Sequence, residues 1–313
     1  PYETTGSYSG TIDWGDGTTS INTYANRAHT YTTPGNYTIT ISGTLIGWSF
    51  FVNPISRLKI YEVLQWSCLR LVNSSGYFYL CTYLTLSNVV DVLDFTGTYD
   101  LTLMFASCPI TTVPFINSWN TSNITNMHGM FNGCPNFDDN IGSWDVSNVT
   151  DMQQMFESNA SFNNGGSPSI STWNTINVTN MFEMFLDAAF FNQPLSGWNV
   201  SNVTNMGYMF HLTAFNQNIN NWDVQNVTNM VSMFDSSSFN QPLSGWNVSN
   251  VTNMSNMFSF TPFDQPISGW NTSNVTNMTN MFRGAQSFNQ DIGYWDVSNV
   301  TNMSLMFQGF PSL

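Results

Sequence analysis

The sequence predicts a small antiparallel β-sandwich followed by a parallel β/α solenoid with coils of about 24–25 residues. Two observations predict the solenoid: a Met-Phe pair recurs from residue 104 onwards, and a Trp recurs in the same step. A third sets the N-terminal unit apart, because residues 1–43 lack this repeat and alternate apolar with polar side chains. We therefore divide the chain into a β unit (1–43), a connecting strand with degenerate repeats (44–118) and a regular solenoid (119–313).

The first 43 residues have the pattern of short strands joined by tight turns. Residues 11–14 and 37–41 alternate like strands, while segments 13–17 and 34–36 contain the turn dipeptides Asp-Gly and Pro-Gly. Asp13 and Asp16 are either turn residues or calcium ligands. A unit this small rarely stands alone, so we expect it to pack on the solenoid, on a further segment or on another chain.

The connecting segment carries a looser apolar pattern, at Leu84, Leu86 and Val89 and again at Val113 and Phe115. Terminal repeats of solenoids are atypical because they also present a cap. We expect residues 54–118 to form the N-terminal end of the solenoid.

All 17 methionines occupy two positions of the repeat. Nine of them open the Met-Phe pair that recurs once per unit, and the other eight lie three residues upstream of that pair. Eight Trp residues recur every 24 or 25 residues, except for one interval of 29 whose excess falls in the Gly- and Pro-containing segment 163–168. Such a period indicates units that bury their apolar faces only by stacking on their neighbours.

Within one unit the pattern changes from strand to helix. The apolar positions of residues 195–203 have the spacing L-x-x-L-x-L-x-x of leucine-rich repeats, in which the alternating part is a strand of a parallel sheet. Between residues 203 and 210 the apolar positions recur at three and four, as on a helix, and Thr204 is a suitable N-cap. We expect a strand, a turn, one or two helical turns and a return loop.

Charge and hydropathy exclude several classes of protein. The chain has 5 Lys and Arg against 19 Asp and Glu, a formal charge of −14, which disfavours nucleic acid as a partner. Its 15% aromatic residues provide surface to bury, so the chain is not disordered. The longest apolar stretch, about residues 45–52, is too short for a membrane helix, and we expect no membrane span.

Asparagine fills two columns of the repeat. The stricter column creates an N-x-T sequon in every unit, and we expect it to form a structural ladder between coils rather than carry sugar. The second column follows Trp, faces away from the Trp and Val side, and alternates with Asp145, Asp223 and Asp296. It makes a polar strip that is either solvated or binds a glycan, a protein or calcium. The ladder residues are Asn123, Asn148, Asn177, Asn202, Asn226, Asn250, Asn274 and Asn299; the candidate N-glycosylation sites are Asn36, Asn73, Asn120, Asn199, Asn247 and Asn271.

Cys81, Cys108 and Cys134 occur once per unit at one register. Neighbouring strands lie about 4.8 Å apart, so these cysteines form either a disulfide or a stack of free thiols. The three histidines occupy unrelated registers, and no pair of Cys-x-x-C motifs occurs. We predict no catalytic, cofactor-binding or metal-binding residues, and therefore no enzyme.

The repeat W-[DN]-V-S-N-V-T-N-M-x-x-M-F, followed by F-N-Q, resembles that of BspA-type leucine-rich-repeat surface proteins over about residues 119–307. The segment 11–18, with residues 29–31 and 35–41, resembles a polycystic-kidney-disease (PKD) type β-sandwich. The resemblance implies an extracellular or cell-surface location and a role in attachment, and it implies no catalytic residues.

Two functions fit these patterns. In the first, the chain is a structural subunit that self-associates head to tail into a fibre or surface layer, because the last unit, residues 303–313, has no polar capping repeat. In the second, it is a surface adhesin that binds a protein or glycan along the exposed sheet face.

Overall fold

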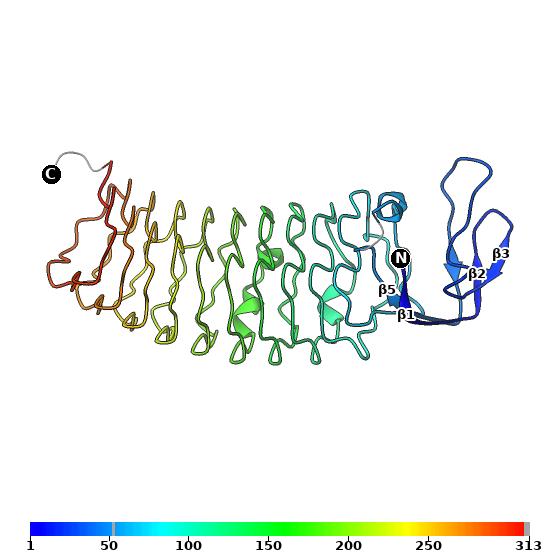
Figure 1. Cartoon of the computed structure of the whole chain (residues 1–313), viewed down its shortest axis with the longest axis horizontal. Coiled ribbons are helices and arrows are strands. Elements are labelled where there is room, and N and C mark those ends of the chain that lie inside the picture. Colours follow the sequence, from blue (N-terminus) through cyan, green and yellow to red (C-terminus); the bar gives the residue numbers. More distant parts are fainter. Residues whose placement is uncertain (52–53, 310–313) are drawn as a thin grey trace.

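The computed structural model describes residues 1–51 and 54–309. Figure 1 shows two small groups of strands at the N-terminal end, followed by a long row of similar coils that lie side by side. Residues 310–313, the end of the last predicted unit, lie outside the described residues.

Three of the N-terminal strands form an antiparallel sheet in the order β3-β2-β4. They are β2 (Thr11–Asp13), β3 (Thr19–Ile21) and β4 (Thr40–Ile41). Ile12 in the central strand is 1% exposed, and the Trp14 indole donates to Ser20 Oγ at 3.0 Å. The turn between β2 and β3 is held by Asp16, whose carboxylate accepts from Thr18 and pairs with His29 Nε2 at 2.8 Å.

The second sheet joins the N-terminus to the coils, in the order β1-β5-β6. Strand β1 (Tyr2–Ser9) pairs antiparallel with β5 (Thr44–Trp48), which pairs in parallel with β6 (Leu69–Arg70). The predicted antiparallel β-sandwich is therefore wrong. One sheet recruits strands from beyond residue 43 and is mixed, because β1 needs a partner that the first 43 residues do not provide.

Successive coils are joined at one residue each by isolated parallel bridges. Neighbouring backbones also exchange hydrogen bonds on both sides of the bridge, as between Thr204 N and Thr179 O at 2.9 Å and between Met206 N and Asn229 O at 3.0 Å. From residue 100 onwards the bridged residues are Asp100, Asn126, Asp151, Asn180, Asn205, Asn229, Asn253, Asn277 and Asn302, and two earlier bridges join Glu62 to Thr85 and Arg70 to Asp94.

The predicted parallel β/α solenoid is also wrong. Around the repeat Trp, where a strand was expected in each regular coil, the structure has none; the single bridged residue, such as Asn205, lies in the segment where a helix was expected, and residues 1–51 and 54–309 contain no α-helix. The reason is that two residues near each Met-Phe pair have left-handed φ angles. One comes directly before the Met, as Tyr208 (+56°), and the other lies two positions after the Phe, as Leu212 (+58°). A right-handed helix cannot continue through such residues. The Thr column consequently caps no helix, and Thr228 Oγ1 donates to Thr204 O of the preceding coil instead.

Short 3₁₀ segments interrupt the coils at four places. They are η1 (Ser56–Lys59), η2 (Ile116–Ser118), η3 (Asn164–Gly166) and η4 (Pro168–Thr172). The last two lie in the long unit between Trp144 and Trp173. There Asn164 is fully buried and its Oδ1 accepts from Ile141 N of the preceding coil at 2.9 Å, so the extra residues are packed rather than loose.

The core is built from aromatic rings stacked along the row of coils. The Phe of each Met-Phe pair stacks on its neighbours, as in Phe185 and Phe210 at 5.8 Å, and on a second Phe of its own coil, as in Phe185 and Phe191 at 3.8 Å. The Trp rings form a third column, whose indoles donate across coils, as from Trp198 Nε1 to Ile170 O at 2.9 Å. The coils are therefore held by side-chain columns as much as by backbone pairing.

Candidate functional site

The residue after each repeat Trp forms a row of exposed Asn and Asp side chains, here called the Asx row. Each Oδ1 accepts the backbone N–H two residues further on, as Asn199 does from Ser201 N at 3.0 Å and Asp223 from Gln225 N at 3.2 Å. This Asx turn fixes the side chain and leaves its second polar atom toward solvent. The row consists of Asn120, Asp145, Asn174, Asn199, Asp223, Asn247, Asn271 and Asp296.

Two carboxylates of the Asx row, those of Asp145 and Asp296, have a lowered pKa. Hydrogen bonds from Ser147 lower the pKa of Asp145, and those from Ser298 lower the pKa of Asp296. The row therefore combines fixed negative charges with neutral amides, as the polar strip in the sequence predicted.

Four candidate glycosylation sites, Asn120, Asn199, Asn247 and Asn271, lie in this row. Each of their Nδ2 atoms makes no hydrogen bond within the described part of the chain, and all four residues are exposed. Asn36 is exposed between β3 and β4. Asn73 is exposed as well, but its Nδ2 donates to Gly97 O and its Oδ1 accepts from Tyr99 N. Asn73 therefore differs from the four Asx-row candidates in having a side-chain amide with both polar atoms hydrogen-bonded.

The stricter Asn column bonds from coil to coil. Its Nδ2 atoms donate to a carbonyl oxygen of the preceding coil at 2.7–2.8 Å, as from Asn202 to Ile176 O. Seven of the eight residues do so, namely Asn148, Asn177, Asn202, Asn226, Asn250, Asn274 and Asn299. Asn123 is exposed and makes no side-chain hydrogen bond to the described residues. All seven acceptors are backbone carbonyl oxygens.

The three stacked cysteines are free and buried. The Cys108 thiol donates to Phe78 O at 2.9 Å and the Cys134 thiol to Phe105 O at 3.0 Å. A hydrogen bond with Cys108 and burial raise the pKa of Cys81, and burial raises that of Cys134. The thiols of Cys81 and Cys134 are therefore held in their protonated form.

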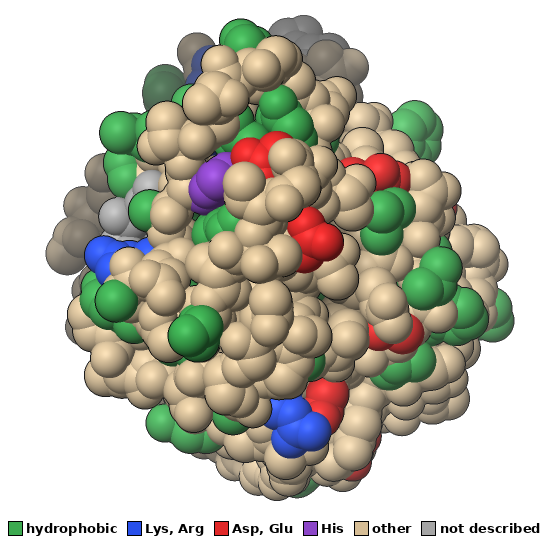
Figure 2. Space-filling view, turned by 90° about the vertical axis from the view of Figure 1, so that its right-hand side faces the viewer, with side chains coloured by type: hydrophobic (Ala, Val, Ile, Leu, Met, Phe, Trp, Pro, Cys, Tyr) green, Lys and Arg blue, Asp and Glu red, His purple; other side chains and the backbone are tan. Residues whose placement is uncertain are grey.

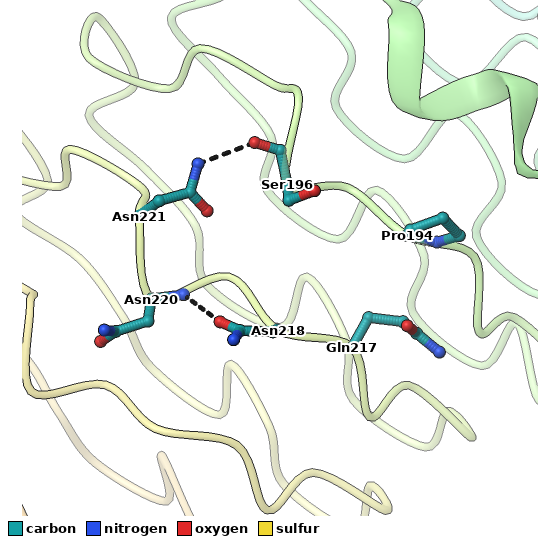
Figure 3. Close-up of a pocket in the computed structure, with 6 residues that line it drawn as sticks. All are labelled: Pro194, Ser196, Gln217, Asn218, Asn220 and Asn221. Atoms are coloured by element: carbon teal, nitrogen blue, oxygen red, sulfur yellow. Dashed lines mark hydrogen bonds between the residues drawn. The ribbon is translucent and has the colours of Figure 1, made fainter.

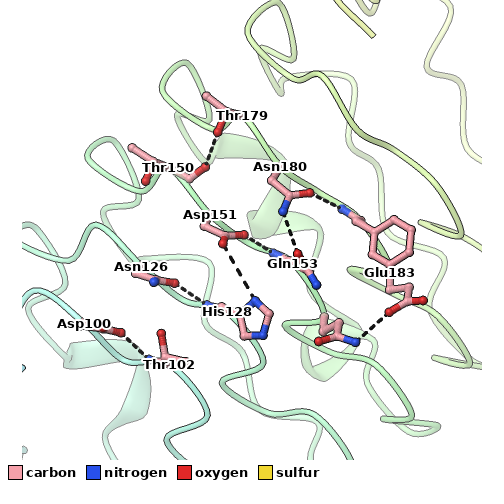
Figure 4. Close-up of polar contacts among 12 residues, drawn as sticks. Asp100, Thr102, Asn126, His128, Thr150, Asp151, Gln153, Thr179, Asn180 and Glu183 are labelled. Carbon is pink, nitrogen blue, oxygen red and sulfur yellow. Dashed lines mark hydrogen bonds and ion pairs between the residues drawn. The ribbon is translucent and has the colours of Figure 1, made fainter. Parts of the chain in front are cut away.

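The side chains of the bridged residues and of their chain neighbours form a second row of polar groups along the coils (Figure 4). Their side chains also form Asx turns, as Asp151 does with Gln153 N, and they are linked across coils, as from Asn180 Nδ2 to Gln153 Oε1 at 2.8 Å. His128 faces Asp151 at 3.9 Å, and Gln154 donates to Glu183 at 2.7 Å. Across residues 1–51 and 54–309, no cluster of His, Cys, Asp and Glu has the arrangement of a metal site.

Two neighbouring coils line a shallow hollow of about 430 Å³, here called the amide hollow. Figure 3 shows Asn221 facing Pro194 and Ser196 across the hollow, with Gln217 and Asn218 along its lower side. Its lining residues are Pro194, Ser196, Gln217, Asn218, Asn220 and Asn221. Our sequence reasoning missed these residues. The signal was present, because residues 218, 220 and 221 are Asn where the flanking coils have Pro, Ser and Gly.

Charged groups are sparse on the surface. Figure 2, which views the N-terminal end, shows isolated acidic and apolar side chains set in a largely uncharged surface. Among the described residues, no helix is long and apolar enough to cross a membrane.

Residues 99–218 and 260–313 match the family described as Mycoplasma protein of unknown function, DUF285. The matched segments make up more than half of the chain and include all of the Asx row except Asp223 and Asn247. No significant match to a curated protein or to a solved structure was found. The chain therefore belongs to the DUF285 family.

Proposed function

We propose that this chain is a non-enzymatic, extracellular or cell-surface repeat protein that binds a protein or glycan partner along its Asx row. The observation that carries the proposal is the row itself. Eight exposed side chains recur once per coil, and each is fixed by a hydrogen bond to its own backbone. Side chains held in this way lose little conformational freedom on binding, which favours recognition of an extended partner.

The family match supports the proposal, because it agrees with the resemblance of the repeat to BspA-type surface proteins. The low charge of the surface also supports it. With 5 Lys and Arg in the whole chain, binding depends mainly on hydrogen bonds from amides and carboxylates.

The test is a triple variant, Asn199→Ser, Asp223→Ser and Asn247→Ser. Serine keeps an acceptor for the turn N–H but removes the outward polar atom. The control variant, Gln286→Ser with Asn289→Ser, changes exposed residues at another register. We expect the unmodified chain and the control to bind on protein and glycan arrays and the triple variant to lose that binding. Equal binding by all three, or no binding by any, would contradict the proposal.

A second candidate function is head-to-tail self-association into a fibre or layer. In the coil that starts at Trp295, Met303, Leu305 and Phe307 are 39, 52 and 41% exposed, whereas Met278 and Phe282 of the preceding coil are fully buried. Covering this apolar surface with a coil of a second copy would be favourable.

Light scattering after size-exclusion chromatography tests this function. Filaments or large particles that dissociate in the Leu305→Asp variant would support self-association. A single species of 35.2 kDa at high concentration would rule it out for this chain.

A further inference from the structure

The amide hollow departs from the repeat in a way that the fold itself does not require. At the fourth, second and first positions before Trp, the coils that end at residues 197, 245 and 269 have Pro, Ser and Gly. The coil that ends at residue 221 has Asn218, Asn220 and Asn221 instead. Other coils also vary at these positions, as with Asn140, Gly142 and Ser143 or Ser169, Ser171 and Thr172, so what distinguishes this coil is that all three positions carry an amide.

In each of the three Asn side chains, one of the two polar atoms forms a hydrogen bond that fixes the position of the amide. Asn218 Oδ1 accepts from Asn220 N at 2.9 Å, and Asn220 Oδ1 accepts from Gly245 N of the next coil at 2.8 Å. Asn221 Nδ2 donates to Ser196 O of the preceding coil at 2.7 Å. The three side chains are therefore tied both within their coil and to both neighbouring coils.

The other half of each amide makes no hydrogen bond within the described part of the chain. These halves are two donors, the Nδ2 groups of Asn218 and Asn220, and one acceptor, Asn221 Oδ1. The carbonyl of Gln217 is a second acceptor, because its Nε2 is occupied by Asn192. Pro194 contributes an apolar ring on the facing side (Figure 3).

This combination suits a neutral, polyhydroxylated ligand. Hydroxyl groups both donate and accept, so they match a site with fixed donors and fixed acceptors at neighbouring positions. All six lining residues are uncharged, which provides no counter-charge for an anionic or cationic ligand. A volume of about 430 Å³ falls in the range of small-molecule sites.

We propose that the amide hollow is a binding subsite for a neutral carbohydrate. This inference deepens the proposed function, on which it rests, by assigning the glycan to a hollow between two neighbouring coils, beside Asp223 of the Asx row. The chemistry is reversible hydrogen bonding, with Pro194 packing against the apolar face of a sugar ring.

The repeat itself supplies the loss-of-function variant. Asn218→Pro, Asn220→Ser and Asn221→Gly together restore the residues found at 194, 196 and 197, so the coil is expected to fold. With the neutral oligosaccharide that gives the strongest array signal, we expect the Kd to rise by about tenfold or more, since each lost hydrogen bond contributes to affinity.

A gain-of-function variant is the control for loss of binding caused indirectly by a change in the fold. Pro266→Asn, Ser268→Asn and Gly269→Asn would build the same six-residue lining two coils further on, with Pro242, Ser244 and Gln265 already in place. A Cβ at Gly269 meets no atom within 4 Å, whereas one at Gly245 would lie 2.6 Å from Asn220 O. Residue 269 is therefore the suitable position, and we expect the stoichiometry of binding to rise from one to two.

Three results would overturn this inference. They are an array with no neutral glycan bound, binding restricted to sialylated or sulfated glycans, and neutral-glycan binding that survives the triple reversion. Binding to the protein array distinguishes a failure of the carbohydrate subsite from a failure of the proposed function. Loss of protein binding in the Asx-row variant, without any glycan binding, would leave the proposed function standing and remove the carbohydrate subsite.

Discussion

At the scale of single residues, the Trp column shows how one buried donor is satisfied by the neighbouring coil. From Trp144 to Trp295, each indole N–H donates to a carbonyl oxygen of the coil before it. Trp119 is the exception, because its Nε1 is buried and finds no partner in the described residues. The two kinds of Trp allow the hydrogen bond to be separated from ring packing.

We predict that Trp198→Phe destabilises the protein more than Trp119→Phe, by about 0.5–1.5 kcal/mol. Both variants lose a similar volume of buried ring, but only Trp198→Phe removes a hydrogen bond, the one to Ile170 O, which then keeps only its bond from Trp173 N. Urea unfolding followed by circular dichroism measures the difference. Equal losses in the two variants would show that the indole bond contributes nothing.

The left-handed residues beside each Met-Phe pair are a second feature of this scale. Leu212 has φ +58° and is 44% exposed, while Gly133 and Gly284 occupy the same register in other coils with φ +65° and +67°. A non-glycine residue in this region costs about 1–2 kcal/mol.

We expect Leu212→Gly to stabilise the protein by up to about 1 kcal/mol, because the relief of strain exceeds the added flexibility of the unfolded chain. Leu212→Val should destabilise it, since β-branched side chains tolerate positive φ poorly. Thermal unfolding of the two variants gives the comparison. A lower midpoint for the glycine variant would contradict the strain argument.

At the scale of the coil, successive coils can place like charges near one another, as with Glu157 and Glu183. Glu157 accepts from Asn132 Nδ2 at 2.6 Å, and burial together with the nearby Glu183 raises the pKa of Glu157 above its ordinary value of 4.5. A raised pKa means that the folded state prefers the protonated form. The wild-type chain therefore loses stability as the pH rises from about 4.5 through the pKa of the folded state.

We predict that Glu157→Gln is more stable than wild type at pH 7 and equally stable near pH 4, because glutamine keeps the acceptor without the charge. Asp145→Asn is the matched control of opposite sign. The pKa of Asp145 is lowered, so its charge stabilises the fold above the ordinary value of 3.8 and that contribution is lost as the pH falls. Urea unfolding of both variants across about pH 2.5–8 measures the two trends, and a Glu157→Gln effect that is independent of pH would disprove the charge argument.

At the scale of the whole molecule, the net charge of −14 is spread along a narrow stack. Few cations offset it, and the one ion pair between a Lys or Arg and a carboxylate among the described residues joins Arg70 to Asp94 at 2.8 Å. Repulsion of this kind disfavours the compact state and is screened by salt.

We expect the midpoint of thermal unfolding to rise when NaCl is increased from about 0.02 M to about 0.5 M, because the screening length then falls well below the dimensions of the stack. Scanning calorimetry at constant pH measures this rise, and KCl at the same concentrations is the control for specific ion effects. A midpoint that falls with both salts would show that favourable charge pairs outweigh the repulsion.

Much of the core and of the polar columns could be predicted, whereas the local backbone could not. Spacing alone placed Trp198, Met206 and Phe210 on the inside and Asn199 on the outside. The same spacing of three and four also predicted a helix, because helical and coiled backbones can present apolar residues at similar intervals. The amide hollow was missed since it depends on a departure from the repeat, which a search for the repeat passes over.

The sequence by itself determined the period, the inward columns of Trp, Met and Phe, and the outward columns of Asn and Asp, because repetition makes each position visible many times. Only the tertiary structure decided the backbone of the coils and the partner of β1. Hydrogen bonds from one coil to the next, such as Phe210 N to Met233 O at 2.9 Å, hold Tyr208 and Leu212 in left-handed conformations that local preference opposes. Pairing of β1 with β5 likewise depends on where the first coils lie, which no local pattern specifies.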